Sequence, residues 1–347
     1  MPAAVRQVQT SKPGLEVSLK VGLTYDTRDD FRFVSEEPED WDAEFEVSTA
    51  IDDIAHAIED LGHRAVFVGS GRKLLDNFRD VERSVDIVFN IAEGYFGRAR
   101  EAQIPAMLEL AGVPYVGSDS YALALAASKW HTKVLAASYG IRTPAFHVIH
   151  NMDELDDLTP DYPVICKLCY EGSSKGLRTD SVANDKPEMA RIVNYLLKNY
   201  KQPVIVEKFI EGREVDVPII GNSPSRAFGV VGLTLNGSLE LGERFLTSDI
   251  VRADGYGFRY PLEERYVKET ELSAVKIYNL LECRDFGRVD LRISEEGLPY
   301  LLEVNPYPFL GKHSSFNEIA KSTIGYDKMI GSILESALLR QMLRKSH

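Results

Sequence analysis

Hydrophobic and polar positions in the first third of the chain alternate between strand spacing and helix spacing. Short apolar runs typical of buried parallel strands occur three times: 19–25, 64–69 and 85–91. Apolar residues at helical spacing also recur in three segments: 47–61, 102–111 and 121–139. We expect each of these segments to form one helix. Alternating strands and helices predict an open α/β domain.

A second group of elements follows, and it contains an unusual lysine. The pattern predicts a strand at 163–169, a helix at 188–200, and two antiparallel strands at 203–210 and 213–220. Lys167 lies inside the first of these strands, where a charged residue is uncommon. Either its ammonium reaches solvent, or it meets a buried anion, which is the interpretation we favour.

Small residues follow this strand, in the segment 170–176 with the sequence YEGSSKG. Backbone N–H groups of such a loop can turn toward phosphate oxygens, although most Gly-Ser loops have no such role. Glu207, Lys208 and Glu214 stand between apolar neighbours on the next two strands. They either border a site for adenine and ribose or form a cross-strand set of ion pairs.

The segment 286–315 has the pattern of a β-hairpin, with two alternating runs around a Ser-Glu-Glu-Gly turn. Glu303 and Asn305 are two positions apart and therefore share a strand face, and Asp290 stands at the matching depth on the partner strand. Carboxylate and amide oxygens are the ligands that Mg²⁺ takes beside nucleotide phosphates. Arg288 adds a cation on the same face. The alternative is a solvated polar face on an ordinary hairpin.

Composition narrows the function classes. The 347 residues are enough for two or three domains, and no run approaches the roughly 18 apolar residues of a membrane span. A net charge of −13 argues against nucleic acid and anionic membranes as partners, but not against ATP. Three cysteines indicate a reducing compartment, and we expect a cytoplasmic protein. Residues 1–16 lack the apolar core of a signal peptide and are predicted to be a disordered tail.

The order of these pieces is similar to that of the ATP-grasp superfamily, and within it the chain resembles the D-alanine–D-alanine ligase group. The resemblance covers residues 19–343 and rests on a lysine-bearing strand, the EGSSKG loop, and the V-E-K-F, E-V-D, G-R-V-D and L-L-E-V-N segments. The E-V-S, G-V-P-Y-V-G-S and S-K-x-x-T-K segments are also similar to motifs of that group. The resemblance implies an α/β (α+β) protein with the ATP-grasp fold. Its domains would be a Rossmann-like α/β domain (17–118), a small central lid domain (119–205) and a catalytic domain (206–347).

The resemblance implies a role for each residue that matches a family motif. The ATP-binding positions are Lys129, Lys167, Ser173, Ser174, Glu207, Lys208, Ile210 and Glu214. In this assignment the first two contact phosphate, the serines form a closing loop, Glu214 takes the ribose, and the remaining three frame adenine. The positions matching metal ligands are Asp290, Glu303 and Asn305, which would hold two Mg²⁺ ions, with Mn²⁺ as a substitute.

Four residues match catalytic positions of the family. Glu46 would hold the ammonium of the first amino acid, and Ser314 would bind the carboxylate of the second. Arg288 would stabilise the tetrahedral intermediate, and Ser173 would act as part of the closing loop. His313 either touches a substrate carboxylate or has a plain structural role.

Some positions depart from the family pattern. Where the ligases have N-x-S-P-G-M-T, residues 305–311 are N-P-Y-P-F-L-G, which places Phe309 at a family glycine and Tyr307 at another small residue. We expect the Phe309 side chain to enter the site of the second substrate. The segment 245–260 corresponds to a flexible lid, with Arg252 and Tyr256 as candidates for the family's Lys-Tyr pair.

These residues support a two-step ligation. A carboxylate would attack the γ-phosphate of ATP to form an acyl phosphate, and an amine would then displace the phosphate to give an amide, ADP and phosphate. Small amino-acid substrates and a homodimer are implied by the resemblance. The alternative is a nucleotide-binding module whose acceptor site is closed and which performs no ligation.

Overall fold

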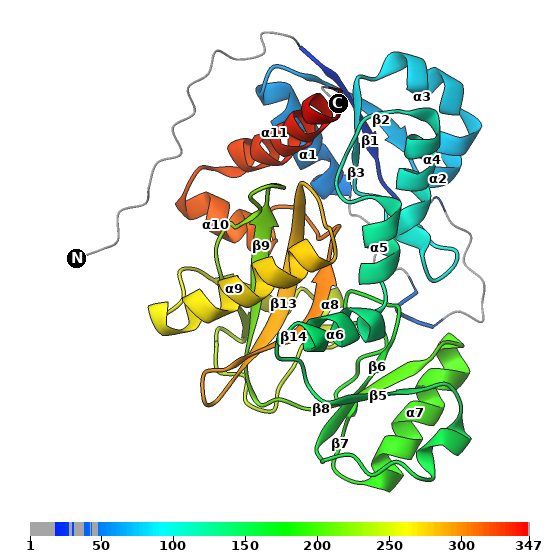
Figure 1. Ribbon diagram of the computed structural model, residues 1–347, viewed down its shortest axis with the longest axis vertical. Helices are drawn as coiled ribbons and strands as arrows, with labels where there is room; N and C mark the ends of the chain where they lie inside the picture. Colours follow the sequence, from blue (N-terminus) through cyan, green and yellow to red (C-terminus); the bar gives the residue numbers. More distant parts are fainter. Residues whose placement is uncertain (1–17, 28–29, 31–37, 42, 44–47, 346–347) are drawn as a thin grey trace.

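The computed structural model describes residues 18–345 except 28–29, 31–37, 42 and 44–47. The tail predicted at 1–16 and Glu46 lie outside the described residues. Within them, three sheets carry the architecture, and each is covered by helices (Figure 1). The first sheet is parallel, whereas the other two are antiparallel.

The first sheet has the strand order β2-β1-β3-β4. Its strands are β1 (Lys20–Thr24), β2 (Arg64–Gly69), β3 (Ile87–Asn90) and β4 (Tyr115–Val116). Its helices are α1 (Ser48–Asp60), α2 (Gly71–Asp76), α3 (Phe78–Ser84), the 3₁₀ turn η2 (Arg100–Ala102) and α4 (Gln103–Ala111). The apolar strands β1 and β3 are buried because helices cover both faces, as expected for a parallel sheet. We call this layer the α/β unit.

The last helix of the chain returns to the α/β unit. Helix α11 (Tyr326–Lys345) packs beside α1 on one face of the first sheet, while α2, α3 and α4 cover the other face (Figure 1). Before it, α10 (Ser315–Ser322) joins the same core through Phe316. The α/β unit and the last two described helices therefore share one hydrophobic core.

The prediction of a single helix over 121–139 is wrong, because the segment forms two helices. These are α5 (Ser120–Ala126), capped by Asp119, and α6 (Lys129–Ser138). Ser128 begins the second helix, because its hydroxyl accepts a hydrogen bond from the His131 N–H and satisfies a free donor of the first turn. Lys129 thus becomes the first residue of α6.

The second sheet has the order β5-β8-β6-β7 and forms the central unit. Its strands are β5 (Phe146–Ile149), β6 (Val164–Leu168), β7 (Val182–Ala183) and β8 (Val204–Lys208). The 3₁₀ turn η3 (Met152–Leu155) and α7 (Lys186–Tyr200) pack on this sheet. Helix α7 begins where the Asp185 carboxylate accepts from the Glu188 N–H and Pro187 stands in the first turn.

The third sheet has the order β12-β11-β9-β13-β14, with β10 also paired to β9, and forms the C-terminal unit. Its strands are β9 (Gly212–Ile220), β10 (Arg226–Ala227), β11 (Val231–Leu235), β12 (Tyr256–Arg259), β13 (Phe286–Ser294) and β14 (Pro299–Asn305). Helix α9 (Glu264–Leu280) covers one face, and the short helix α8 (Ser248–Arg252) precedes β12. The hairpin predicted at 286–315 is confirmed as β13 and β14.

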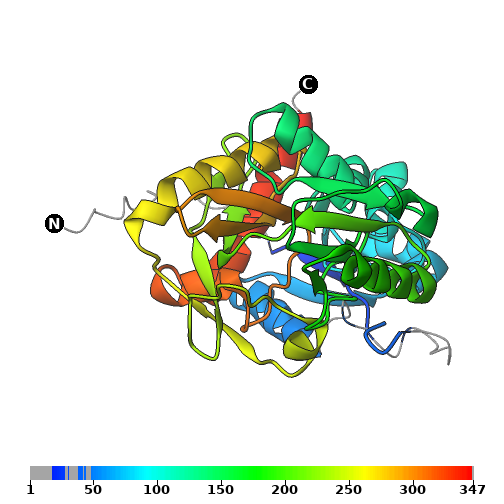
Figure 2. The same ribbon diagram turned by 90° about the horizontal axis from the view of Figure 1, so that it is seen from below.

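The expected pairing of the strands at 203–210 and 213–220 is wrong. Strand β8 pairs with β5 and β6 in the second sheet, whereas β9 pairs with β10, β11 and β13 in the third. The short connection Phe209–Glu211 crosses from one sheet to the other. Both strands still border the same space, because the two sheets lie side by side (Figure 2).

The division into three domains stays a prediction. Its second boundary, between residues 205 and 206, does not agree with the bounds of the strands. Strand β8 continues to Lys208, so a boundary at 205–206 falls inside a strand of the central unit. The mixed α/β class is confirmed by one parallel and two antiparallel sheets. Over the described part of the chain, no helix is both long and apolar enough to cross a membrane.

One buried ion pair fastens the end of the chain to the third sheet. Arg340 on α11 contacts the Asp285 carboxylate at 2.6 and 2.9 Å, and Asp285 is fully buried. The same carboxylate accepts from the Gly117 N–H and from the Asn222 amide at 2.8 and 3.0 Å. Asp285 therefore joins β4, β13 and α11 at one point.

Replacing Arg340 with methionine should destabilise the protein by about 3 kcal/mol, because a buried carboxylate would lose its cation. Chemical denaturation measures this difference. Lys321→Met is the matched control, since Lys321 forms an exposed pair with Glu318 at 3.2 Å and should cost less than about 1 kcal/mol. Equal effects of the two variants would contradict this role of Asp285.

Candidate active site

A cleft runs between the second and third sheets and has two connected pockets. The first pocket has an empty volume of about 730 Å³ and takes residues from β6 and β8 on one side and from β9, β13 and β14 on the other. The second pocket has about 1150 Å³ and extends toward residues 93–101 of the α/β unit. Both pockets include Lys129, Ser174, Glu214, Asp290 and Glu303, so they form one continuous site.

Glu207 lies at the base of the first pocket with two lysines. Its side chain is 1% exposed, and its carboxylate pairs with Lys133 Nζ at 2.9 Å and with Lys167 Nζ. Lys133 also donates to Thr143 Oγ1 at 3.0 Å and to the Leu301 carbonyl at 3.1 Å. Lys167 therefore meets a buried anion, as expected, and this anion belongs to the neighbouring strand. The expected cross-strand set of Glu207, Lys208 and Glu214 does not form, because Lys208 contacts Tyr162 and Asp161 and Glu214 pairs with Arg292.

The charge of Glu207 depends on these lysines. Burial alone would raise the pKa of its carboxyl, but the Lys133 and Lys167 ammonium groups outweigh burial and lower the pKa to about 2. Lys133 is fully buried, and burial lowers the pKa of its ammonium despite the nearby carboxylate. Lys167 is slightly exposed, at 13%, and lines the pocket. It is thus the lysine of the pair that can meet a ligand.

Apolar side chains form the walls of the first pocket. Among them are Ile165, Leu168, Phe209, Ile210, Phe245, Leu246 and Leu302. Lys208 lines the pocket as well, but its ammonium donates to the Tyr162 carbonyl at 2.7 Å. A slot with apolar walls from two sheets and a few polar groups at its edge suits a flat, largely apolar base.

Glu214 stands at the edge of this slot on β9. Arg292 on β13 pairs with it at 3.2 Å, and also donates to the carbonyls of Gly242 and Arg244 at 2.8 Å each. The Arg292 guanidinium lies over the Phe209 ring, 4.9 Å from its centroid. Arg292 therefore fixes both the carboxylate and one wall of the slot. The sequence pattern showed Arg292 in the alternating strand but gave it no role.

Three carboxylates form a row across adjacent strands, and we call them the carboxylate row. Asp290 on β13 stands opposite Glu303 on β14 and opposite Asp216 on β9. The predicted juxtaposition of Asp290 and Glu303 is confirmed, whereas Asp216 was not anticipated. Asn305 donates to Asp290 Oδ2 at 2.8 Å through its amide nitrogen. The whole group lies along the floor of the cleft.

Arg288 and Lys129 are the cations beside this row. Arg288 makes two hydrogen bonds to Asp290, at 2.6 and 2.7 Å, and lies 3.5 Å from Asp216. Lys129 pairs with Glu303 at 2.6 Å. Burial raises the pKa of Asp290 to about 7, since Arg288 compensates it only partly and the Asp216 carboxylate adds repulsion. The fold therefore disfavours the charged form of Asp290.

The donor set of the row fits a divalent cation. Carboxylates at this density in a buried site are stabilised by an added cation, and oxygen ligands are those that Mg²⁺ takes. Over the described part of the chain, no three acidic, histidine or cysteine side chains already converge as a metal-binding group. Asp290 and Glu303 instead face Arg288 and Lys129. Metal binding would thus require these cations to move aside.

The loop after β6, which we call the Gly-Ser loop (Tyr170–Gly176), forms the roof between the two pockets. Ser173 and Ser174 have φ of 49° and 56°, a left-handed conformation that non-glycine residues seldom adopt. Two tight turns hold it, with the Lys175 N–H donating to the Gly172 carbonyl and the Leu177 N–H to that of Ser174, both at 2.9 Å. Ser174 lines both pockets and Ser173 lines the second.

The second pocket has an aromatic wall formed partly by Phe309. The Phe309 ring lies over Gly311, where a Cβ would be only 2.3 Å from its Cζ. Ala50 of α1 lies against the same glycine. Phe309 lines the pocket that contains Arg288 and Asn305, and the entry of its side chain into the site of the second substrate stays a prediction. A side chain at position 311 would collide with the Phe309 ring, so the ring requires glycine there.

Other predicted residues lie nearer the edge of the site. Tyr307 lines the second pocket, but it is 6% exposed and its hydroxyl donates to the Ser118 carbonyl at 3.3 Å. Ser314 caps α10, with its hydroxyl accepting from the Asn317 N–H at 3.2 Å, and it is buried. Ser314 is not among the described residues that line either pocket.

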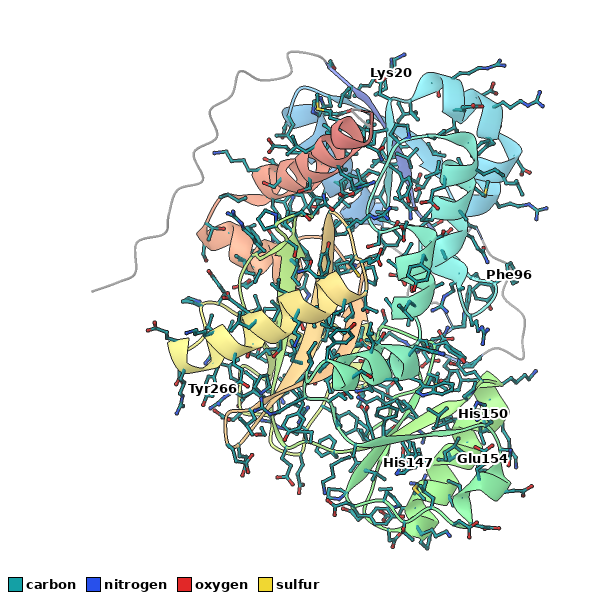
Figure 3. The ribbon with its side chains drawn as sticks, in the orientation of Figure 1. Lys20, Phe96, His147, His150, Glu154 and Tyr266 are labelled. Carbon is teal, nitrogen blue, oxygen red and sulfur yellow. The ribbon has the colours of Figure 1, made fainter. Side chains whose placement is uncertain are left out.

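The segment expected to be a flexible lid contains α8 and β12. Tyr256 on β12 lines the second pocket and stacks on His313, with ring centroids 4.9 Å apart. His313 pairs with Asp254 at 2.5 Å, which supports a structural role for this histidine. Arg252 is exposed at the end of α8. Two further histidines, His147 and His150, lie on the central unit, where His150 pairs with Glu154 at 3.5 Å (Figure 3).

Known proteins match this chain over most of its length. A family model described as "D-ala D-ala ligase C-terminus" matches residues 135–335, which include the cleft and the carboxylate row. The chain belongs to the D-alanine–D-alanine ligase family. The D-alanine–D-alanine ligase of Cupriavidus necator is 33% identical over 259 residues, which are 73% of this chain and 76% of that protein.

Two further matches extend the comparison. An uncharacterized protein of Sinorhizobium fredii, y4sG, is 31% identical over 302 residues, covering 82% of this chain and 86% of the relative. The crystal structure of the Bacillus anthracis D-alanine–D-alanine ligase complexed with ATP aligns with a TM-score of 0.69 at 18% identity. It covers 94% of this chain and 100% of that chain, which shows the shared ATP-grasp fold.

Family membership confirms several sequence predictions. Ligases of the D-alanine–D-alanine family are ATP-dependent and ADP-forming, so the predicted enzyme class is confirmed, as are the use of ATP and of a divalent metal. The roles of individual residues remain predictions. Lys133, Glu171, Asp216 and Arg292 belong to the site and were missed. Lys133 had a local signal, since it is the last residue of the S-K-x-x-T-K segment.

The lowered pKa of Glu207 predicts a stability that depends on pH. Its folded pKa of about 2 lies below the ordinary 4.5, so its contribution is complete above about pH 4.5 and is lost as the pH falls toward 2. Relative to Glu207→Gln, the wild-type protein should lose an advantage of about 3 kcal/mol over this range. Urea unfolding of both proteins at pH 6 and pH 3.5 should show the first part of this loss, about 1.4 kcal/mol, because pH 3.5 lies one unit below the ordinary pKa. A difference that does not vary with pH would contradict the assigned pKa.

Proposed function

We propose that this member of the D-alanine–D-alanine ligase family joins two amino acids, or amino-acid-like substrates, through an acyl phosphate, and that its acceptor differs from D-alanine. The observation that carries the proposal is the continuous cleft. An apolar slot bordered by Lys167 and Glu214 opens into a second pocket that holds Arg288 and the carboxylate row. A nucleotide in the slot would direct its phosphates toward that row.

The nucleotide would lie between the second and third sheets. Ile210 and the backbone near Glu207 and Lys208 would frame the adenine, and Glu214 would accept hydrogen bonds from the ribose hydroxyls. Lys129 and Lys167 would contact the phosphates, because each ammonium lines the first pocket. Ser173 and Ser174 would close over the γ-phosphate, where their N–H groups can donate.

Asp290, Glu303 and Asn305 would hold two Mg²⁺ ions, with Mn²⁺ able to replace them. When bound, the metal ions neutralise phosphate charge and favour attack at phosphorus. Lys129 would then leave Glu303 and pair with a phosphate. Arg288 would leave Asp290 and turn toward the second pocket, with Asp216 as its remaining carboxylate neighbour at 3.5 Å.

The ligation would take place in two steps. The carboxylate of the first amino acid attacks the γ-phosphorus, which gives an acyl phosphate and ADP. The amine of the second amino acid then attacks the acyl carbon, and the phosphate leaves after the amine gives up its proton. The Arg288 guanidinium would stabilise the oxyanion, since it has N–H donors in a fixed plane beside the cleft.

Substrate choice would depend on Glu46, Ser314 and Phe309. Glu46 would bind the ammonium of the first substrate, and Ser314 at the start of α10 would bind the carboxylate of the second. Phe309 occupies part of the wall where relatives in the family pattern have a glycine. A ring in this position either excludes an acceptor side chain or packs against one, and a misplaced methylene changes binding by roughly 1–3 kcal/mol.

The alternative of a nucleotide-binding module with a closed acceptor site receives no support from the cleft. The Phe309 ring lies against Gly311, and a pocket lined by Phe309, Arg288 and Asn305 remains beside it. We further propose that the protein acts as a homodimer in the cytoplasm. Its three cysteines are free and buried, which suits a reducing compartment.

Asp290→Asn and Glu303→Gln should each abolish turnover, because each variant removes a carboxylate from the metal site. Asp290→Asn should keep or raise the melting temperature, since the pKa of about 7 shows that the charged form is disfavoured in the fold. Phosphate release measures turnover, and thermal unfolding measures the melting temperature. Glu296→Gln, in the hairpin turn, serves as the control. Near wild-type turnover in either variant would overturn the metal assignment.

The acceptor can be identified by a screen of amino-acid pairs, read by phosphate release and product mass. We expect D-alanine to be a poor acceptor. With the best pair in hand, Phe309→Gly should change the ratio of kcat/KM between acceptors by at least about tenfold, or 1.4 kcal/mol. Phe309→Leu keeps apolar bulk and should change the ratio less. Efficient D-alanyl-D-alanine synthesis by the wild-type protein would refute the proposed specificity.

A further inference from the structure

The Gly-Ser loop is attached to the α/β unit at its first end. Arg100, whose side chain is 7% exposed, pairs with the Glu171 carboxylate at 3.1 Å and donates to the Tyr170 carbonyl at 3.3 Å. The same carboxylate accepts from the Gln202 amide at 2.8 Å and pairs with Lys175 at 3.2 Å. Glu171 is therefore held by two other segments of the chain and by Lys175 of its own loop.

The far end of the loop is attached to the α/β side of the molecule by another residue. Asp40 is 5% exposed, and its carboxylate oxygen Oδ2 accepts from the Gly176 N–H at 2.7 Å. Its other oxygen accepts from the Tyr200 hydroxyl at 2.8 Å. Next to it, the Trp41 ring packs edge-on against Tyr95, with centroids 6.0 Å apart. Asp40 is far from the loop in sequence and does not belong to any motif.

The loop needs such support because its conformation is strained. Ser173, Ser174 and Gly176 all have positive φ, and only the last is a glycine. A short loop in this shape retains it only when its surroundings fix both ends. The residues between the two attachments are the ones proposed to close over the γ-phosphate.

We infer that Asp40 and Arg100 are positioning residues that clamp the Gly-Ser loop at both ends in its phosphate-binding shape. Neither residue would touch ATP. The clamp links the unit proposed to bind the first amino acid with the loop proposed to bind phosphate. This assignment rests on the proposed function for its effect on catalysis, but the clamp itself is a property of the unliganded protein.

The clamp predicts a difference between binding and turnover. The apolar slot lies on the other side of the loop, so Asp40→Asn and Arg100→Met should change the Kd of ATP by less than about threefold. The kcat should fall by about tenfold or more, because loop closure contributes most near the transition state. Arg100→Lys, which keeps the charge, should restore part of the kcat.

Limited digestion with trypsin tests the clamp without any ligand. Asn at position 40 keeps the shape of the side chain but removes its charge, so the hydrogen bond from the Gly176 N–H loses its charge-assisted strength. Cleavage after Lys175 should become at least about tenfold faster in Asp40→Asn and in Arg100→Met, because local opening governs cleavage of a folded protein. Tyr200→Phe removes one contact of Asp40 and should give a smaller increase in the same direction.

Exposed Asp157 provides the matched control, and Asp157→Asn should be cleaved at the wild-type rate. Wild-type cleavage rates in Asp40→Asn, Arg100→Met and Tyr200→Phe would overturn the clamp, even if kcat fell. If Asp40→Asn does not fold, Arg100→Met and Tyr200→Phe decide the question by the same comparison. If the wild-type protein joins no pair of amino acids, the proposed ligation fails while the cleavage rates still decide the clamp.

Discussion

Charge balance in the buried cleft is the constraint on which the rest of this structure depends. Five carboxylates of the cleft lie on strands β8, β9, β13 and β14: Glu207, Glu214, Asp216, Asp290 and Glu303. Five cations accompany them: Lys129, Lys133, Lys167, Arg288 and Arg292. A buried charge without a partner costs several kcal/mol, so these groups are tolerable only when the elements that carry them come together. Packing of two sheets and one helix satisfies this condition.

The balance is uneven, and the unevenness separates structural from functional charges. Glu207 has two lysines and a pKa of about 2, so its charge is fixed by the protein alone. Asp290 shares Arg288 with Asp216, and burial raises its pKa to about 7. The first arrangement supports the fold, whereas the second disfavours the charged form of Asp290, which an added divalent cation would favour. The number of cations beside each carboxylate thus differs between the ion pairs that stabilise the fold and the group proposed to bind a ligand.

The units that surround the cleft are joined by polar contacts as well as by packing. Arg340 joins the last helix to Asp285, and Asp40 and Arg100 join the α/β unit to the Gly-Ser loop. Each contact is buried or nearly so, where a hydrogen bond to a charged group contributes more than at the surface. A loop with strained backbone angles can therefore have one shape in the absence of ligand. This links the proposed amino-acid site to the phosphate site through residues outside the cleft.

The sequence by itself determined the features that depend on local periodicity. The alternation at 286–305 predicted the hairpin, the shared face of Glu303 and Asn305, and the position of Asp290 opposite Glu303, because a strand has a repeat of two. Motif order gave the family and the fold, and the apolar strand around Lys167 indicated a buried anion. Helical spacing predicted that 121–139 is helical, but it did not predict the interruption at Ser128. The N-cap at Ser128 starts a new helix without changing the spacing of the apolar residues.

Only the tertiary structure decided which distant segments meet. Strands at 203–210 and 213–220 have the pattern of neighbours, yet they belong to different sheets, because pairing depends on all the strands available and not on proximity in sequence. Asp216 joins the carboxylate row through its register with Asp290, and Asp40 reaches Gly176 across 136 positions of sequence. Periodicity carries no information on such contacts, because it records which face a side chain occupies and not what lies opposite that face.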